Sequence, residues 1–320
     1  MSNYLSRQDS RAASVKAPRR RWALVAVCLL VLCLSTLSSG ASARHVTDQT
    51  GRQVDVPDRP RRIVSLAPNI TEIIYALGAS AELVGDTDYC DYPPEAKLKP
   101  HVGEVVNPSL ERIVALKPDL VFGTADANRR ETADQLARLG IPLYGLAAHN
   151  LAQTLVSIQD VGEVLGRETE AQELLRTLRS RVAAVEKRVS GQPRPKVLFV
   201  VWYRPLITAG PQTFISDVIH RAGGISISDD LKGEWPRLSL EVALQRDPDV
   251  ILIPKTAAFS PSLEEFEKLP GWKELRAVKD RRLYFVPETI LRPSPRLVDA
   301  LEEVAAILHP APGAPPRTSR

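Results

Sequence analysis

The chain has 320 residues, of which 25% are charged and 5% are aromatic, and its formal net charge is +4. Its first 43 residues contain six Lys or Arg and one Asp, so the remaining 277 residues carry a net charge of −1. This balance excludes a chain that binds nucleic acid through a strongly basic surface. The length suffices for two domains of ordinary size, each with its own core.

Residues 1–43 are typical of a secretory signal peptide. Three arginines at 19–21 precede a short apolar stretch over 22–37, and small residues at 41–43 form a cleavage site. The apolar stretch is short for a membrane span, and no later segment approaches the required length, so we expect a soluble periplasmic protein. Cys28 and Cys33 follow Val27 and Leu32 rather than small residues, which disfavours a lipid anchor.

Strand and helix patterns alternate over residues 44–150, which we assign to an N-terminal α/β lobe. The turn-rich segment 44–60 predicts a hairpin. Apolar runs predict strands at 63–66, 83–85, 120–123 and 143–146, and helical periodicity predicts helices at 69–77 and 129–139. Asn69 is the candidate N-cap of the first helix, with Glu72 three residues later. This alternation predicts a parallel sheet covered by helices.

A helical connector over 151–192 leads into a C-terminal α/β lobe over 193–309. Apolar residues recur at helical spacing from Leu151 to Val189; Gly166 is a candidate break, and the second half predicts one long bridging helix. The C-terminal lobe has predicted strands at 197–201, 250–253 and 283–286, and predicted helices at 214–222 and from Ser294 to Leu308. The Pro-rich segment 310–320 predicts a disordered tail.

One motif occurs in both lobes. Ser109-Leu110-Glu111 precedes Pro118-Asp119, and Ser239-Leu240-Glu241 precedes Pro248-Asp249 at the same spacing. Each Ser can cap a helix whose first turn contains the Glu, and each Pro-Asp pair ends that helix before a buried strand. A Glu at this position can simply stabilise its helix end, but two matched copies would also suit a two-point docking surface.

Enzyme motifs are missing from the sequence. It has no Gly-rich phosphate loop, no Gly-x-Ser-x-Gly and no His-Glu-x-x-His, so no catalytic residue is assigned. The histidines after the signal peptide lack metal-ligand spacing, although His101 and His149 fall in predicted loops, where distant segments could form a metal site. Cys90 is the one cysteine after residue 43, which excludes an internal disulfide there.

Aromatic residues are few, yet several follow predicted strands. They are Tyr89 and Tyr92, the adjacent pair Trp202-Tyr203, and Trp235 shortly before the second repeat. Loops beyond strand ends are where α/β sheets bind ligands, and flat rings there would suit a large planar ligand. Because neighbours on a strand point to opposite faces, one of Trp202 and Tyr203 must leave the core side.

The sequence resembles the class III periplasmic substrate-binding proteins of ABC importers for cobalamin, siderophores, haem and some metals. The resemblance covers essentially all of the chain after the signal peptide and begins with the run from Val46-Thr47-Asp48 to Ala76-Leu77-Gly78. The segment Tyr89-Cys90-Asp91-Tyr92-Pro93-Pro94-Glu95 and the run from Asn107 to Val121 are most similar to the cobalamin-binding branch. At 105–106 this chain has Val-Val, where that branch can carry a Trp.

The resemblance implies two Rossmann-like lobes with parallel-rich sheets, joined by a single long backbone helix, with ligand in the cleft between the lobes. It further implies that Glu111 and Glu241 engage arginines on the two permease subunits. It places the following residues near the ligand: Tyr89, Trp202, Tyr203, Trp235 and Glu288.

We therefore expect a monomeric, non-enzymatic periplasmic protein that captures a corrinoid, first of all cobalamin, and delivers it to an ABC importer. It would need no cofactor of its own and no protein ligand to the metal. Capture of haem or a ferric siderophore is the alternative, kept open by Arg204, Arg292 and Tyr89. A secreted two-lobe metalloenzyme would require several cysteines or metal-spaced histidines.

Overall fold

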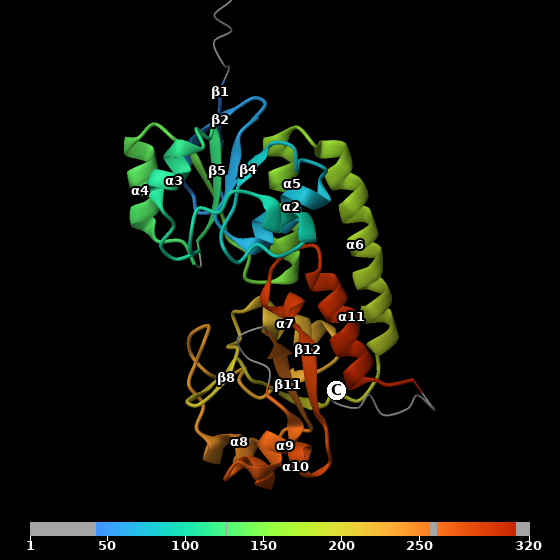
Figure 1. Cartoon of the computed structure of the whole chain (residues 1–320). Helices are drawn as coiled ribbons and strands as arrows, with labels where there is room; N and C mark the ends of the chain where they lie inside the picture. The colour runs from blue at the N-terminus through green and yellow to red at the C-terminus, as the bar shows by residue number, and fades with distance from the viewer. Residues whose placement is uncertain (1–42, 126, 257–260, 312–320) are drawn as a thin grey trace, which may run out of the picture. The chain divides into compact units, whose positions relative to one another are not determined.

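Two four-stranded parallel sheets form the framework of the protein, with strand orders β4-β3-β5-β6 and β10-β7-β11-β12 (Figure 1). The computed structural model describes residues 43–125, 127–256 and 261–311. Residues 1–42 of the proposed signal peptide (1–43) and residues 312–320 of the proposed tail (310–320) lie outside these residues. The two sheets with their helices confirm the expected α/β class.

The N-terminal lobe comprises the elements from β1 to β6. A hairpin of β1 and β2 precedes the sheet and pairs Ala43 with Pro57 at its open end, which confirms the predicted hairpin. The strands are β1 Ala43–Thr47, β2 Gln53–Pro57, β3 Ile63–Ser65, β4 Leu83–Gly85, β5 Leu120–Thr124 and β6 Leu143–Leu146; the helices are α2 Pro68–Ala76, η1 Pro94–Leu98, α3 Leu110–Ala115 and α4 Arg130–Arg138.

One prediction for this lobe is wrong. Helix α2 begins at Pro68, its N-cap is Ala67, and no side chain caps it, so Asn69 is not the N-cap. Proline is favoured at the first helical position because its fixed backbone angle suits the helix and its missing N–H would have no partner there. Glu72 consequently has a different role, described below.

The connector consists of α5 Leu151–Leu165 and α6 Glu168–Val189. Gly166 ends α5 in the left-handed conformation at φ 65°, so it is the predicted break. A side chain at Gly162 could not fit, because its Cβ would lie 2.5 Å from the Ala171 Cβ, and the two helices approach closely here. The long helix α6 buries one stripe at helical spacing, made of Ala171, Leu175, Leu178, Val182, Val185 and Val189.

The C-terminal lobe comprises the elements from β7 to α11. Its last helix begins at Leu297, three residues after the predicted start at Ser294. The strands are β7 Lys196–Phe199, β8 Trp202–Tyr203, β9 Leu206–Ile207, β10 Ile225–Ser226, β11 Val250–Lys255 and β12 Leu283–Pro287; the helices are α7 Phe214–Arg221, α8 Leu240–Arg246, α9 Leu263–Lys268, η2 Trp272–Glu274, α10 Arg276–Lys279, η3 Glu288–Leu291 and α11 Leu297–Leu308.

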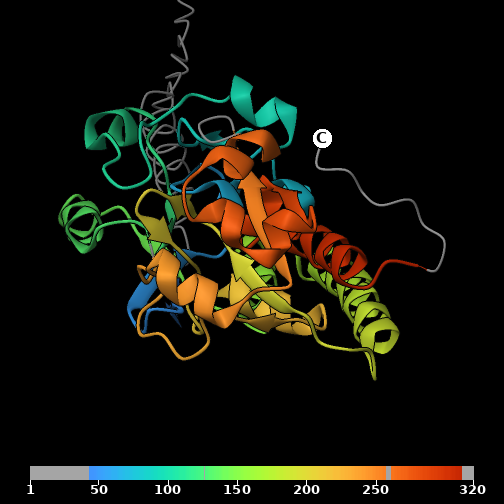
Figure 2. The same ribbon diagram turned by 90° about the horizontal axis from the view of Figure 1, so that it is seen from below.

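One apolar cluster runs through both lobes and the connector. It takes Ile63 and Leu120 from the first sheet, Val197 and Val250 from the second, and the buried stripe of α6. Alternate strand residues face smaller clusters on the opposite sides of the sheets, as the two-residue period of a strand requires. Helix α11 packs beside α6 (Figure 2). Within the described ranges, no helix has both the length and the apolar character to cross a membrane.

Candidate functional site

The proposed ligand residues all follow the carboxyl ends of parallel strands. Tyr89 comes after β4, the pair Trp202-Tyr203 after β7, Trp235 after β10, and Glu288 after β12. These strands belong to both sheets, so each lobe contributes loops of the kind that bind ligands in open α/β folds.

Trp202 and Tyr203 have different surroundings, as expected of neighbours on a strand, whose side chains point to opposite faces. Trp202 is 42% exposed and donates its Nε1–H to the Arg204 carbonyl at 2.9 Å. Tyr203 packs its ring edge-on against the buried Phe266, with centroids 5.8 Å apart. Trp202 is therefore the member of the pair that offers an aromatic face to the surroundings, and Tyr203 supports the hairpin from the core side.

A second exposed tryptophan lies in a loop attached to the same hairpin. Backbone pairing joins Trp202 to Ile207 within β8 and β9, and Ile207 in turn pairs with Arg237. Gly210 donates its N–H to the Glu234 carbonyl at 2.7 Å, which fixes the loop beside Trp235. The structure thus brings the segments of the two exposed tryptophans together.

Tyr89 and Glu288 belong to a different group, connected through Arg292. Tyr89 is 55% exposed in the loop after β4. Arg292 lies 2.5 Å from a Glu288 oxygen and 2.5 Å from an oxygen of Asp91, two residues beyond Tyr89. Glu288 is therefore paired with an arginine of its own segment. A ligand that contacted Glu288 would also contact Arg292.

Glu72 lies at the centre of this charged group, although its carboxylate is only 2% exposed. Arg292 contacts it at 3.2 Å and Arg296 at 2.6 Å, and the Ser294 hydroxyl donates to its second oxygen at 2.6 Å. The name Glu72 cluster is used below for this group, whose members are Glu72, Asp91, Glu288, Arg292, Ser294 and Arg296. It joins α2 of the N-terminal lobe to the segment between β12 and α11.

Charges inside the Glu72 cluster stabilise one another. Burial alone would lower the pKa of Arg292, but the hydrogen bonds and charges of Asp91 and Glu288 outweigh burial and raise it. Burial would likewise raise the pKa of Asp91, yet the pKa is lowered because Arg292 donates to the carboxylate. The Arg296 guanidinium also lies 3.6 Å from the centre of the Tyr92 ring, a cation–π contact.

Sequence reasoning did not find this cluster. Glu72 and its partners Arg292, Ser294 and Arg296 are 220 or more positions apart, and the sequence indicated only a helix-capping role for Glu72. A usable signal existed in the helix itself: Glu72 falls among Ile70, Ile73 and Ile74 on the buried side of α2. A carboxylate at a core position requires a charged or hydrogen-bonding partner.

The lobes also meet where α5 and α7 begin. His149 and Glu234 approach to 3.4 Å, and Asp217 of α7 accepts the Leu151 N–H at 2.9 Å. These residues surround a hollow of about 570 Å³. Contacts between the lobes therefore exist here as well as at the Glu72 cluster.

The two motif copies have the same local geometry. The Ser109 and Ser239 hydroxyls accept the backbone N–H groups of Arg112 and Val242 at 3.3 Å and 3.2 Å. Glu111 lies in the first turn of α3, Glu241 lies in the first turn of α8, and both are exposed. The predicted caps are confirmed, and each copy of the motif presents one exposed glutamate near a helix start.

The likeness extends to the ends of these helices. Lys117 and Asp247 both have left-handed backbones, with φ 48° and 47°. The following Asp119 accepts the Arg62 N–H at 3.0 Å, and Asp249 accepts the Lys196 N–H at 2.7 Å. Each Pro-Asp pair thus connects its helix to the start of the neighbouring strand, at the end of the sheet opposite the proposed ligand loops.

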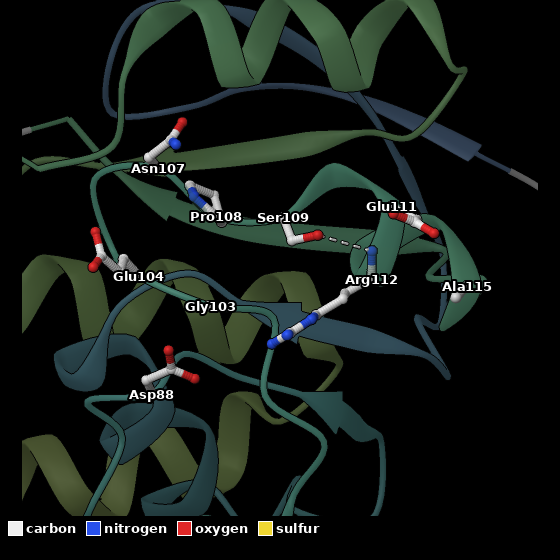
Figure 3. A pocket seen from close by; sticks show the side chains of 9 residues that line it. All are labelled: Asp88, Gly103, Glu104, Asn107, Pro108, Ser109, Glu111, Arg112 and Ala115. Carbon is white, nitrogen blue, oxygen red and sulfur yellow. Dashed lines mark hydrogen bonds between the residues drawn. The ribbon is translucent and has the colours of Figure 1, made fainter.

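A hollow of about 650 Å³ lies beside Glu111 (Figure 3). Asp88, Glu104 and Glu111 line it with carboxylates, and Arg112 extends from α3 toward the segment of Gly103, where it donates to the His101 carbonyl at 3.5 Å. The surface around the first docking candidate is therefore concave and mainly acidic.

Candidate metal ligands do not gather in the part of the chain that the structure describes, which contains no group of three His, Cys, Asp or Glu side chains able to hold an ion. His101 instead contacts the buried Asp86 at 2.8 Å. Burial raises the pKa of Cys90 to about 11, against the hydrogen bonds from Thr71 and Thr87. The buried thiol is therefore expected to stay protonated at neutral pH.

Comparison with known proteins identifies the family. Residues 63–289 match the model of the periplasmic binding protein family. An uncharacterized ABC transporter substrate-binding lipoprotein, YvrC of Bacillus subtilis, is 30% identical over 274 residues, which cover 83% of this chain and 85% of that protein. The vitamin B12-binding protein of Yersinia pestis is 32% identical over 206 residues, which cover 64% and 73%.

Solved structures agree with this assignment. The periplasmic vitamin B12-binding protein BtuF of Vibrio cholerae has a TM-score of 0.71 and 28% identity, covering 79% of this chain and 98% of that one. The periplasmic haem-binding protein RhuT of Roseiflexus sp. RS-1 has a TM-score of 0.71 and 31% identity, covering 78% and 97%. The resemblance inferred from the sequence is confirmed: this chain belongs to the periplasmic binding protein family.

Proposed function

We propose that this chain captures a corrinoid, with cobalamin as the first candidate, and delivers it to an ABC importer. The observation that carries the proposal is the set of half-exposed rings of Tyr89, Trp202 and Trp235, in loops at the carboxyl ends of strands from both sheets. Large flat rings suit the broad, mostly apolar faces of a corrin. Relatives described as vitamin B12-binding proteins support the same ligand class.

The charges near these loops favour a ligand without a carboxylate of its own. Arg292 already contacts three carboxylates, those of Glu72, Asp91 and Glu288. An anionic group of haem or of a ferric siderophore that paired with Arg292 would displace one of these carboxylates from the arginine. Cyanocobalamin carries no net charge and would not require this exchange.

Haem is the second candidate. The likeness to the haem-binding RhuT supports it, as does the exposed phenol of Tyr89, an oxygen ligand that ferric iron accepts. Arg204 is exposed as well and could face a propionate.

Delivery would use the paired glutamates. Glu111 and Glu241, one on each lobe, would meet basic side chains on the two permease subunits, which would contribute orientation and association rate more than affinity. The name of the YvrC relative supports an ABC transporter as the partner. ATP hydrolysis would take place on the partner's ATPase subunits, the chain would act in the periplasm after removal of its signal peptide, and it would not itself be an enzyme.

Calorimetric titration tests the ligand. The secreted chain, beginning at Arg44, is titrated with cyanocobalamin, with haem and with a ferric siderophore. Saturable one-to-one binding of cyanocobalamin, much tighter than that of the iron compounds, is the expected result. Binding of haem alone would replace the first candidate with the second.

Matched variants locate the site. Trp202→Ala should weaken binding of cyanocobalamin at least tenfold, because truncation of a tryptophan at the centre of an interface typically costs about 2 kcal/mol or more. Leu139→Ala is the control, since Leu139 is also an exposed large apolar residue, 54% exposed, but lies at the end of α4. Equal effects of the two substitutions would show that the tryptophan does not contact the ligand.

A further inference from the structure

The Glu72 cluster connects three segments that surround the proposed ligand site. Glu72 belongs to the first turns of α2, which follows β3; Asp91 belongs to the loop after β4; and Arg292 belongs to the segment after β12. All three follow the carboxyl end of a strand. Two of them contain proposed ligand residues, Tyr89 and Glu288.

Within the Glu72 cluster, most of the hydrogen bonds between the two lobes end at the Glu72 carboxylate, and Arg292 also contacts Asp91. Both Glu72 oxygens are used: one lies 2.6 Å from Arg296 and 3.2 Å from Arg292, and the other accepts from Ser294 at 2.6 Å and from Arg296 at 3.0 Å. All of these donors come from the segment between β12 and α11. One buried side chain of the N-terminal lobe therefore fixes four donor contacts of the C-terminal lobe.

A buried ion pair is a poor choice for stability alone. Removing charges from water costs free energy that their attraction only partly returns, and an apolar replacement of similar volume is often as stable. The value of such a pair is that it permits few alternative arrangements: an arginine beside a buried carboxylate has a fixed direction, whereas apolar side chains can repack. Arg292 also contacts Asp91 and Glu288, so the same arginine restricts the positions of these two carboxylates.

We propose that Glu72 is a positioning residue that holds the loops at 86–92 and 288–296 in their ligand-binding geometry before the ligand arrives. The proposal rests on the proposed function only in taking these loops as the ligand loops. A prearranged site loses less conformational freedom on binding, so its affinity is higher for the same contacts. Without the Glu72 carboxylate the loops would sample other positions, and the ligand would have to order them.

Hydrogen exchange of the ligand-free protein tests the proposal directly. In Glu72→Gln, which keeps the size of the side chain and removes its charge, exchange of the backbone amides in 86–92 and 288–296 should be at least tenfold faster than in the wild type. Asp299→Asn is the matched control, because Asp299 contacts Arg181 between α11 and α6, another arginine–carboxylate pair between distant segments. Unchanged exchange in both loops of Glu72→Gln would overturn the proposal.

Titration with cyanocobalamin provides a second measurement. A positioning role predicts that Glu72→Gln binds cyanocobalamin at least fivefold more weakly than Asp299→Asn under conditions where both variants are fully folded. Equal affinities would overturn the proposal, because a merely structural role would leave the folded variant competent. If the wild type does not bind cyanocobalamin, the proposed function fails, and the positioning role is decided by the exchange measurement alone.

Arg292→Lys is the second variant if Glu72→Gln does not fold. Lysine keeps a positive charge but lacks the planar guanidinium, whose several N–H groups contact three carboxylates at once. The backbone amides of the same two loops should therefore exchange faster. Protection equal to that of the wild type in this variant would contradict the proposal.

Discussion

Asp86 should make the stability of this protein depend on pH, because its carboxylate is buried with one of its oxygens unpaired. The side chain is fully buried; His101 contacts one oxygen at 2.8 Å, and the other has no hydrogen-bond partner. Burial raises the pKa of Asp86 from 3.8 to about 6, although the hydrogen bond and charge of His101 and the charge of Lys99 act to lower it. We predict that Asp86→Asn removes this pH dependence.

The direction in which stability changes with pH follows from how many protons the folded and unfolded chains bind. Between pH values near 4 and 6 the folded chain holds the Asp86 proton and the unfolded chain releases it, so raising the pH favours the unfolded chain. The stabilisation is complete below the unfolded pKa and is lost as the pH rises through the folded pKa. A shift of about two units corresponds to roughly 3 kcal/mol, of which about 2.5 kcal/mol should be lost between pH 4 and pH 8.

Urea unfolding, followed by circular dichroism across this pH range, measures the effect. The free energy of unfolding of the wild type should fall relative to that of Asp86→Asn by about 2.5 kcal/mol from the acid to the alkaline end. Asp58→Asn is the control, since Asp58 is an exposed carboxylate of the same lobe that is not among the groups acting on Asp86, and a comparable change with pH is expected only for Asp86→Asn. A difference between wild type and Asp86→Asn that does not change with pH would refute the reasoning.

Three further predictions concern docking, the tryptophan loop and the thiol. The double variant Glu111→Ala, Glu241→Ala should bind ligand normally but associate with the permease–ATPase complex at least tenfold more weakly in a lipid-disc binding assay, because both proposed ion pairs are lost. Gly210→Ala should lower the free energy of unfolding by about 1–3 kcal/mol and weaken cyanocobalamin binding in the same titration, since its Cβ would lie 2.0 Å from the Gly233 carbonyl oxygen. Cys90 should react with a thiol reagent near neutral pH only after unfolding, because it is buried and its pKa is raised.

Controls for these variants come from the same chain. Glu131 and Glu264 are also exposed glutamates in the first turn of a helix, one in each lobe, and their replacement by alanine should not affect docking. Gly191→Ala strains a left-handed backbone at φ 74° without any nearby atom, so it should lower stability while leaving ligand binding unchanged. Loss of docking in the control pair, weakened binding in Gly191→Ala, or rapid modification of native Cys90 would contradict the corresponding prediction.

Periodicity and local residue chemistry sufficed to predict most of the secondary structure. The long helix α6 shows its buried stripe in the sequence, and the repeated Ser-Leu-Glu and Pro-Asp motifs predicted two helices with matched caps and ends. These signals are readable because their causes lie within a few residues of one another. The two-residue strands β8, β9 and β10 were missed, since so short a run has no periodicity to detect.

The sequence by itself determined the α/β class, the family, the two capped Ser-Leu-Glu helices and the set of candidate aromatic residues. Only the tertiary structure decided that Trp202 is the exposed member of its pair, that Glu288 is held by Arg292, and that Glu72 joins the two lobes rather than capping its helix. The physical reason is distance along the chain. A buried charge takes its role from whichever partners the fold brings to it, and the partners of Glu72 are about 220 residues away.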